Sequence, residues 1–341
     1  NTDSLSVDVL FAGCVGYQQR RIERRASGRS WSLILYEPED GPYRNTNVTT
    51  QTMAPAAISG NTTLTSSEPF FRSSHVGALF RVESIGQTVS KNMTVLNDAP
   101  NSIRVTGVGT DRSFTIVLAN LSATGNTVVL QRSFDDSVWV DVATKSWTAD
   151  TTEAYEDGLD NQIVYYRLLC SVYAAGATDA SLSIATGSVV GVCRVTGFTT
   201  NLVVDVEVIT DFGGTTASDT WAEGLWSEYR GWPSAGALYE GRLNWDGFDR
   251  IVLSVSDAFD AFDPDTEGDS GPINRTIGSG PMDTINWALP LQRLILGAQL
   301  AEYSVRSNTF DEPLTPTNFN CKRCSKEGSA AVQAVSLGSR G

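Results

Sequence analysis

The stretch Thr127–Val142, TVVLQRSFDDSVWVDV, holds two short runs of alternating apolar and polar residues separated by five residues. A period of two places every second side chain on one face of a β-strand, so that one face is buried and the other is exposed. Similar runs occur at Ser113–Leu118, Val164–Leu168 and Ser181–Ala185. Five strands within about seventy-five residues predict a two-sheet sandwich over 113–188, with Trp139 and Tyr166 between its sheets.

The composition of the whole chain is that of a β-protein. Its 341 residues include 34 Thr, 35 Ser and 30 Gly but only 4 Lys. Thr is enriched in strands, whereas Gly and Ser are enriched in the turns that join them. Hydrophobic residues make up 41%, which is ample for a core and excludes a disordered acidic chain. No apolar run reaches the roughly 18 residues of a membrane-spanning helix, so we expect no membrane insertion.

Thr-rich strands both precede and follow the predicted sandwich. We therefore expect a β-barrel or β-sandwich platform made of 1–112 and 189–232, into which a fibronectin-like sandwich, 113–188, is inserted. From Pro233 the strands become shorter and more tightly turned. Short antiparallel strands in groups of three or four are typical of propeller blades, so 233–341 is predicted to form propeller-like blades. Ser256–Phe262 is predicted to make one helical turn there.

The charge is uneven along the chain. There are 25 Lys and Arg against 39 Asp and Glu, a net charge of −14. Sixteen acids and four Arg lie in Asp205–Asp283, a net of −12. Such acidity fits a merely soluble surface, and it equally suits a channel along which DNA slides without sticking. The candidate lining of such a channel is a cluster of six acids: Asp257, Asp260, Asp263, Asp265, Glu267 and Asp269.

The basic residues gather in Gln18–Arg29, QQRRIERRASGR. In a helical turn, residues four apart would share a face and make two basic rows. We favour a solvated surface, or pairing with the acids of a neighbouring subunit, over direct contact with phosphates. The candidate residues for contact with another protein subunit are Arg20, Arg21, Arg24 and Arg25.

Three features resemble metal or catalytic sites but lack part of the required set. In Asp263–Asp269 oxygen ligands alternate as in a calcium loop, yet Asn274 stands where a bidentate Glu belongs, which favours an acidic surface loop. Cys321 and Cys324 have the spacing of a metal or redox pair, but no second pair accompanies them. The single histidine, His75, is predicted to be a hydrogen-bonded surface group. We therefore predict no cofactor, no metal, no catalytic residues and no enzymatic activity.

Five stretches, quoted in chain order, cover nearly the whole sequence: Gly16–Arg25; Glu39–Tyr43 with Val76–Val82; Leu130–Asp135 with Trp139; Trp221–Pro233 with Leu238–Trp245; and Ile285–Leu289 with Leu294–Gly297 and Leu300–Val305. Together they resemble the tail nozzle family of short-tailed phages, also called tail tubular protein B. The resemblance implies a structural protein of the virion tail that is assembled in the host bacterial cytoplasm.

Members of that family form rings, typically homohexamers, below the head-to-tail adaptor and conduct DNA during ejection. The resemblance thus implies three kinds of partner: further copies of this chain, the adaptor with other tail proteins, and double-stranded DNA as a passenger that is not tightly bound. The basic cluster is then a candidate contact with a subunit or the adaptor. Members combine β-rich platform regions with an irregular propeller and are considerably longer. Two blades do not close a propeller, which leaves three alternatives: a fragment, a shorter relative, or a chain whose propeller is completed in another way.

A second hypothesis is a tail-associated carbohydrate-binding protein or depolymerase, like a tailspike or adhesin. Trp221, Trp226 and Trp232 lie close together in the sequence and could stack on sugars, while pairs of acids could hydrolyse them. The long repeats of most tailspikes are absent. A bacterial extracellular adhesin is a third interpretation.

Overall fold

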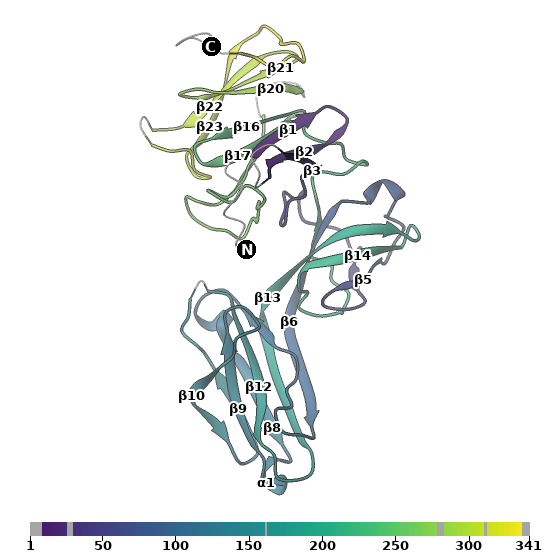
Figure 1. The fold of residues 1–341 in the computed structure, drawn as a ribbon, viewed down its shortest axis with the longest axis vertical. Coiled ribbons are helices and arrows are strands. Elements are labelled where there is room, and N and C mark those ends of the chain that lie inside the picture. Colours follow the sequence, from purple (N-terminus) through teal and green to yellow (C-terminus); the bar gives the residue numbers. More distant parts are fainter. Residues whose placement is uncertain (1–8, 26–29, 161, 278–282, 310–311, 336–341) are drawn as a thin grey trace.

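The predicted all-β class is confirmed by the structure. A computed structural model describes residues 9–25, 30–160, 162–277, 283–309 and 312–335. These contain strands β1–β23, and their helices are short turns such as α1 (Leu121–Thr124). Figure 1 shows an elongated molecule with a β-sandwich at one end, a smaller β-unit in the middle and two sheets at the other end.

The sandwich consists of two antiparallel four-stranded layers. One sheet has the order β10-β9-β12-β7, with the bounds Val140–Trp147, Thr127–Ser133, Val164–Val172 and Ile103–Val105. The other layer has the order β11-β8-β13-β6, with the bounds Thr151–Tyr155, Phe114–Ala119, Thr178–Phe198 and Leu79–Met93. Burial alternates strictly along β8, so the alternation read from the sequence is the one that builds the core.

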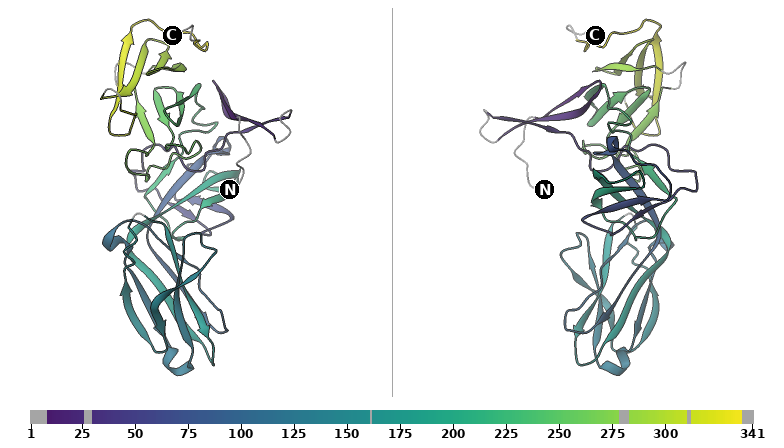
Figure 2. Two further views of the ribbon diagram at one scale, coloured as in Figure 1. Left: turned by 60° about the vertical axis from the view of Figure 1, so that its left-hand side comes forward. Right: turned by 90° about the vertical axis from the view of Figure 1, so that its right-hand side faces the viewer.

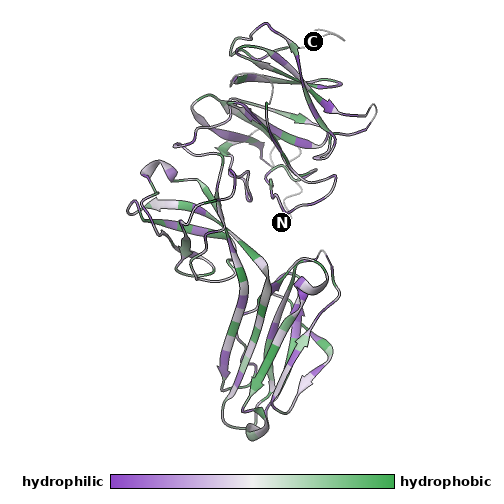
Figure 3. Ribbon diagram, turned by 180° about the vertical axis from the view of Figure 1, so that it is seen from behind, coloured by the Kyte–Doolittle hydropathy of each residue, from purple (hydrophilic) through white to green (hydrophobic). Residues whose placement is uncertain are grey.

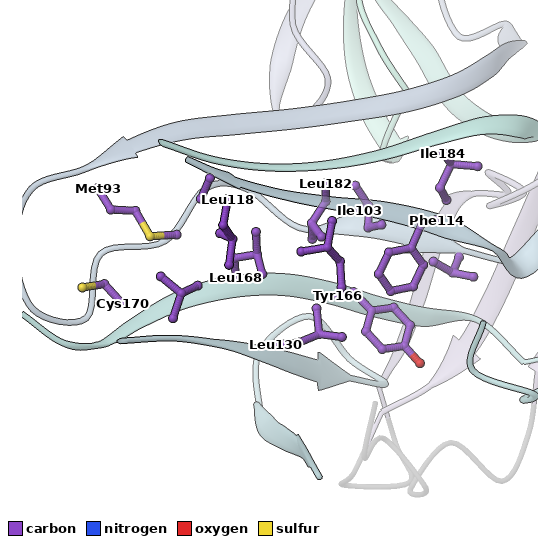
Figure 4. Close-up of a cluster of buried hydrophobic side chains, with 14 of the residues drawn as sticks. Met93, Ile103, Phe114, Leu118, Leu130, Tyr166, Leu168, Cys170, Leu182 and Ile184 are labelled. Atoms are coloured by element: carbon purple, nitrogen blue, oxygen red, sulfur yellow. The ribbon is translucent and has the colours of Figure 1, made fainter. Parts of the chain in front are cut away.

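Aromatic and aliphatic side chains from both layers fill the sandwich core. Tyr166 is fully buried with its ring centroid 4.9 Å from that of Phe114, which confirms its predicted place between the sheets (Figure 4). The prediction for Trp139 is wrong. This residue lies just before β10, outside the buried cluster, with the Arg167 guanidinium 4.2 Å from its ring centroid. It therefore belongs to the rim of the sandwich.

Strands β6 and β13 join the sandwich to the middle of the molecule. Strand β6 pairs with Thr178–Arg194 of β13, with one register shift between Ile184 and Ser188, and Figure 1 shows both strands running through both units. Hydrophobic and hydrophilic residues alternate along them (Figure 3). The sequence places the start of the sandwich at residue 113, whereas its core already includes Met93, Ile103 and Val105. The polar residues of β6 hide this continuity because the strand is stabilised by pairing with β13.

The middle unit is the platform, a strongly curved sheet with the strand order β4-β5-β14-β13-β6-β15. The bounds of its remaining strands are Met53–Pro55 for β4, Asn61–Ser66 for β5, Val203–Thr210 for β14 and Trp221–Glu223 for β15. A bridge between Met53 and Ser218 links the β4 edge to the segment that leads into β15. The sheet thus curls toward a barrel around a core that includes Phe80 and Phe212.

Two antiparallel four-stranded sheets follow, in the orders β16-β17-β18-β19 and β20-β21-β22-β23. Their bounds are Ala235–Tyr239, Arg242–Gly247, Arg250–Leu253 and Ile273–Thr276, then Ile285–Pro290, Leu294–Ala298, Glu302–Ser307 and Phe319–Ser325. They share one apolar core, as blades do, but among the described residues they form no closed propeller. The helical turn predicted for Ser256–Phe262 is wrong, because Asp260 and Phe262 bond to Glu39 and Asp40 instead.

The first three strands form a separate antiparallel sheet, which we call the arm: β1 (Val9–Cys14), β2 (Tyr17–Arg24) and β3 (Trp31–Leu35). Figure 2 shows the arm extending sideways from the blades. The basic cluster thus lies on a strand rather than on a helical turn.

Candidate interaction surfaces and the junction between them

The arm has two different faces, as expected for an alternating sheet. Its inner face carries Phe11, which packs edge-to-face against Tyr36 and Trp245 at centroid distances of 5.8 and 6.4 Å. Gly13 also meets Trp245, since a Cβ at this glycine would lie 2.9 Å from the indole ring. These contacts attach the arm to the first blade.

The outer face of the arm is apolar yet open to solvent. The register aligns Leu10, Ile22 and Leu33 in one row across the three strands. Leu10 is 58% exposed, Leu33 65% and Trp31 50%. Contiguous exposed apolar surface of this kind is typical of an interaction site.

The structure divides the four candidate arginines between the two faces. Arg20 is exposed and lies opposite Ala12 and Leu35, in the row beside the apolar one, and Arg24 lies opposite Trp31. By contrast, Arg21 is 2.5 Å from Glu23 on the inner face, and Arg25 is 3.7 Å from the same carboxylate. The cluster is therefore not a single basic row.

The six candidate acids lie on the loop between β18 and β19, which we call the acidic loop (256–271). Two of them bind an arginine of the same chain. Arg81 of β6 donates to both Asp265 oxygens, at 2.8 and 2.9 Å, and lies 3.8 Å from Asp263. Asp263 also accepts the Asp265 N–H at 2.9 Å. These contacts fix the blade to the platform and leave no calcium-loop arrangement at Asp263 and Asp265.

The acidic loop is held from within by a buried guanidinium. Arg242 donates to the carbonyl oxygens of Ser254 at 2.7 Å, Gly271 at 2.6 Å and Asp269 at 2.5 Å. Its side chain is almost completely buried, and burial lowers its pKa. The clamp leaves Asp257, Glu267 and Asp269 exposed on an ordered loop, while Asp260 is half-buried.

The segment from Tyr36 to Arg44 joins the arm, the platform and the blades. The Glu39 N–H donates to Asp260 O at 2.9 Å, and the Phe262 N–H donates to Asp40 O at 2.7 Å. On its other side the Arg44 N–H donates to Glu223 O at 2.8 Å. The Asp40 carboxyl accepts the Tyr43 hydroxyl at 2.7 Å, and burial raises the pKa of Asp40 to about 6.

His75 belongs to this junction, and the prediction that it lies on the surface is wrong. The ring is fully buried, and its Nδ1 accepts the Arg72 N–H at 2.9 Å. The ring proton is therefore on Nε2, 3.2 Å from Glu223. Arg230 also binds Glu223, with Nε 2.9 and 3.0 Å from its oxygens. Burial would raise the pKa of Glu223, but His75 and Arg230 outweigh it and hold that pKa below its ordinary value.

The sequence missed three arginines that organise this region: Arg81, Arg230 and Arg242. Of the three, the sequence pattern could have placed only Arg81, because alternation along β6 puts it on the face opposite the buried Phe80 and Val82. Arg242 binds carbonyl groups outside the strands, and Arg230 binds the Glu223 carboxylate at the end of β15, and a one-dimensional pattern reveals neither pairing.

The three clustered tryptophans form no common exposed surface. Trp221 lies in the platform core and donates its indole N–H to Gln51 O at 2.9 Å. Trp226 packs against Phe262 in a different cluster, with ring centroids 5.5 Å apart. Trp232 is half-buried. These residues thus do not offer the stacking platform that the carbohydrate hypothesis predicted.

Cys321 and Cys324 lie on β23, three positions apart, and side chains at that spacing point to opposite faces of a strand. Cys321 packs against the blade core, where burial raises its pKa to about 12, and Cys324 is exposed. Across the described residues, no group of three or more His, Cys, Asp and Glu is placed to hold a metal ion.

No family model matches the chain, and no curated protein matches it. None of the helices in the described part of the chain is long and apolar enough to span a membrane.

Proposed function

We propose that this chain is a non-enzymatic structural protein of a short-tailed phage tail. In this proposal it is one subunit of a homohexameric nozzle ring that lies below the head-to-tail adaptor in the virion. The ring conducts double-stranded DNA during ejection and does not bind it tightly.

One observation carries the proposal: exposed carboxylates and exposed apolar side chains lie on two different parts of one connected β-structure. The acidic loop presents exposed carboxylates from a backbone clamped by Arg242. The arm presents exposed apolar residues and Arg20 at another place. An acidic wall repels phosphates, which a conduit needs, and an exposed apolar face favours assembly.

The test is the protein content of purified virions of the phage that encodes the chain. Mass spectrometry should find the chain in stoichiometric amounts, and antibodies against the exposed sandwich should label the tail in negative-stain images. Absence from purified virions, together with a strictly monomeric purified protein, would remove the proposal.

One pocket favours the carbohydrate hypothesis as a second candidate. It has a volume of about 300 Å³ between sandwich and platform, and its lining includes Trp139, Tyr165, Arg104, Asp136 and Asp211. Aromatic rings beside charged hydrogen-bonding groups suit a sugar ring. A glycan array with a polysaccharide-cleavage screen tests this; no signal in either would remove it.

A further inference from the structure

The arm is unusual in exposing the face that a small sheet normally buries. Leu10, Ile22 and Leu33 form a row across all three strands, with Leu35 and Trp31 on the same face. The opposite face already packs on Tyr36 and Trp245. The outer face is therefore not needed to hold the arm in place, and Leu10, Trp31 and Leu33 on it are at least half exposed among the residues that the structure describes.

The charge of the arm indicates what covers it. Residues 9–35 contain five Arg and one Glu, a net charge of +4, so that the rest of the chain carries −18. Two arms repel each other, whereas an arm and the body of another copy attract each other. Charge complementarity therefore favours an arm-to-body contact between copies over an arm-to-arm contact.

The acidic loop is the part of the body best prepared for such a contact. Asp263 and Asp265 are engaged by Arg81 of their own chain. Glu267 and Asp269 are exposed, and the Arg242 clamp holds the loop backbone in place. The contact uses these two acids and leaves Asp257 and Asp260 for the channel of the proposed function. A pre-ordered acidic loop loses little entropy on docking.

We infer that the outer face of the arm docks on the acidic loop of a second copy of this chain, with Arg20 directed toward Glu267 and Asp269. Such a contact joins two different surfaces, so it can be repeated from copy to copy and close into a ring. Only the closure into a ring rests on the proposed function; the docking of one copy on another does not.

Arg20→Glu with Leu33→Asp is the variant that tests the arm, and sedimentation velocity of the full chain is the measurement. We expect the wild-type chain to form oligomers that weaken at high salt, and the variant to stay monomeric with an unchanged circular dichroism spectrum. The control is Val140→Asp on the sandwich, where Val140 is 59% exposed, and this variant should assemble like the wild type.

A charge exchange tests the acidic loop. Arg20→Glu alone and Glu267→Arg with Asp269→Arg alone should each assemble at least tenfold more weakly than the wild type. An equimolar mixture should recover assembly, because each altered arm then meets an oppositely altered loop. A mixture that assembles no better than its components overturns the docking assignment.

The two proposals fail in different ways. If the arm variant still forms rings, the docking inference is wrong while the proposed function stands. If the wild-type chain is monomeric at every protein and salt concentration, a second copy does not cover the outer face of the arm, and the docking inference is overturned.

Discussion

At the scale of single residues, Arg242 places a positive charge inside the blade unit and pairs it with carbonyl oxygens. Without this arginine, the buried carbonyl groups of Ser254 and Gly271 and the partly buried one of Asp269 would each lose a hydrogen-bond donor. The arginine thus converts a loop rich in repelling carboxylates into an ordered surface. The proposed channel and the proposed docking of the arm both depend on an ordered acidic loop.

Arg242→Met should lower the free energy of unfolding by about 3 kcal/mol, because buried carbonyls that lose their donor cost about 1–3 kcal/mol each. Urea unfolding of the full chain measures this. Arg275→Met is the matched control, since the Arg275 side chain is exposed and donates to Pro316 O at 3.1 Å, and its effect should be small. Equal effects of the two variants would contradict the role of the clamp.

Asp40 should give the protein a pH dependence of known sign. Burial raises the pKa of Asp40 from its ordinary value of 3.8 to about 6, so the folded state binds the proton more tightly than the unfolded state does. The protonated Asp40 carboxyl therefore stabilises the folded state at low pH, and this contribution to stability is lost as the pH rises between about 4 and 6.

Asp40→Asn should remove that loss while keeping an acceptor for the Tyr43 hydroxyl. Compared with the wild type, the variant should become relatively more stable as the pH rises from about 4 to about 7. Urea unfolding at both pH values measures the difference. A stability difference that does not change with pH would refute the assignment.

His75 shows where reasoning from sequence stops at this scale. Its neighbours Ser73 and Ser74 are polar, so a surface site was expected. Its burial depends on Glu223, Arg230 and Tyr229, which come far later in the chain. By contrast, Tyr166 was placed correctly because its own strand alternates.

At the scale of elements, the sandwich is held by an ion pair beneath its aromatic core. Arg112 and Asp157 are both inaccessible to solvent and lie 2.6 Å apart, and the Tyr166 hydroxyl donates to the same carboxylate at 2.7 Å. These contacts link the turn before β8 to the segment before β12 and to β12 itself.

Asp157→Ala should destabilise the sandwich by about 3–5 kcal/mol, because it leaves a buried guanidinium without its partner. Hydrogen exchange of the full chain should show faster exchange in β8 and β12 and unchanged exchange in the blades. Glu156→Ala, at an exposed neighbouring position, should have little effect. Uniform loss of protection in all units would contradict a local role.

The elements themselves were predictable where one face is buried. The alternating run Ser113–Leu118 predicts β8 (Phe114–Ala119) to within one residue, because its alternation reflects the sandwich core. Strands β11, β19 and β23 were missed because their sequences are polar, and pairing with a neighbouring strand stabilises them. In the arm, β3 was predicted from the alternation of Ser30–Leu35, whereas β2 was not predicted as a strand, since charged residues fill it.

At the scale of the whole molecule, the uneven charge of the sequence becomes an arrangement of surfaces. The net charge of −12 over Asp205–Asp283 can be counted in the sequence. Which of these acids are paired with arginines cannot be read from it. Arg81 engages Asp263 and Asp265, and Arg230 engages Glu223, so fewer acids remain for an outside partner. Strands β7–β12 of the sandwich lie in sequence between β6 and β13, which pair with each other.

Charge reversal on the acidic loop should slow DNA release if the loop faces the passing DNA. Phages that carry Asp257→Lys with Asp260→Lys should eject their DNA more slowly, because the added positive charges bind phosphates. Light scattering or dye fluorescence after triggered ejection measures the rate. Glu156→Lys on the sandwich is the control, and unchanged kinetics in the loop variant would refute a channel-lining role.

The central claim is that copies of this chain form a ring around a channel. Negative-stain electron microscopy of the purified full-length chain tests it most directly. The account predicts class averages of closed rings with a central opening wide enough for double-stranded DNA. Particles that remain single elongated molecules, alone and when the adaptor is added, would contradict it.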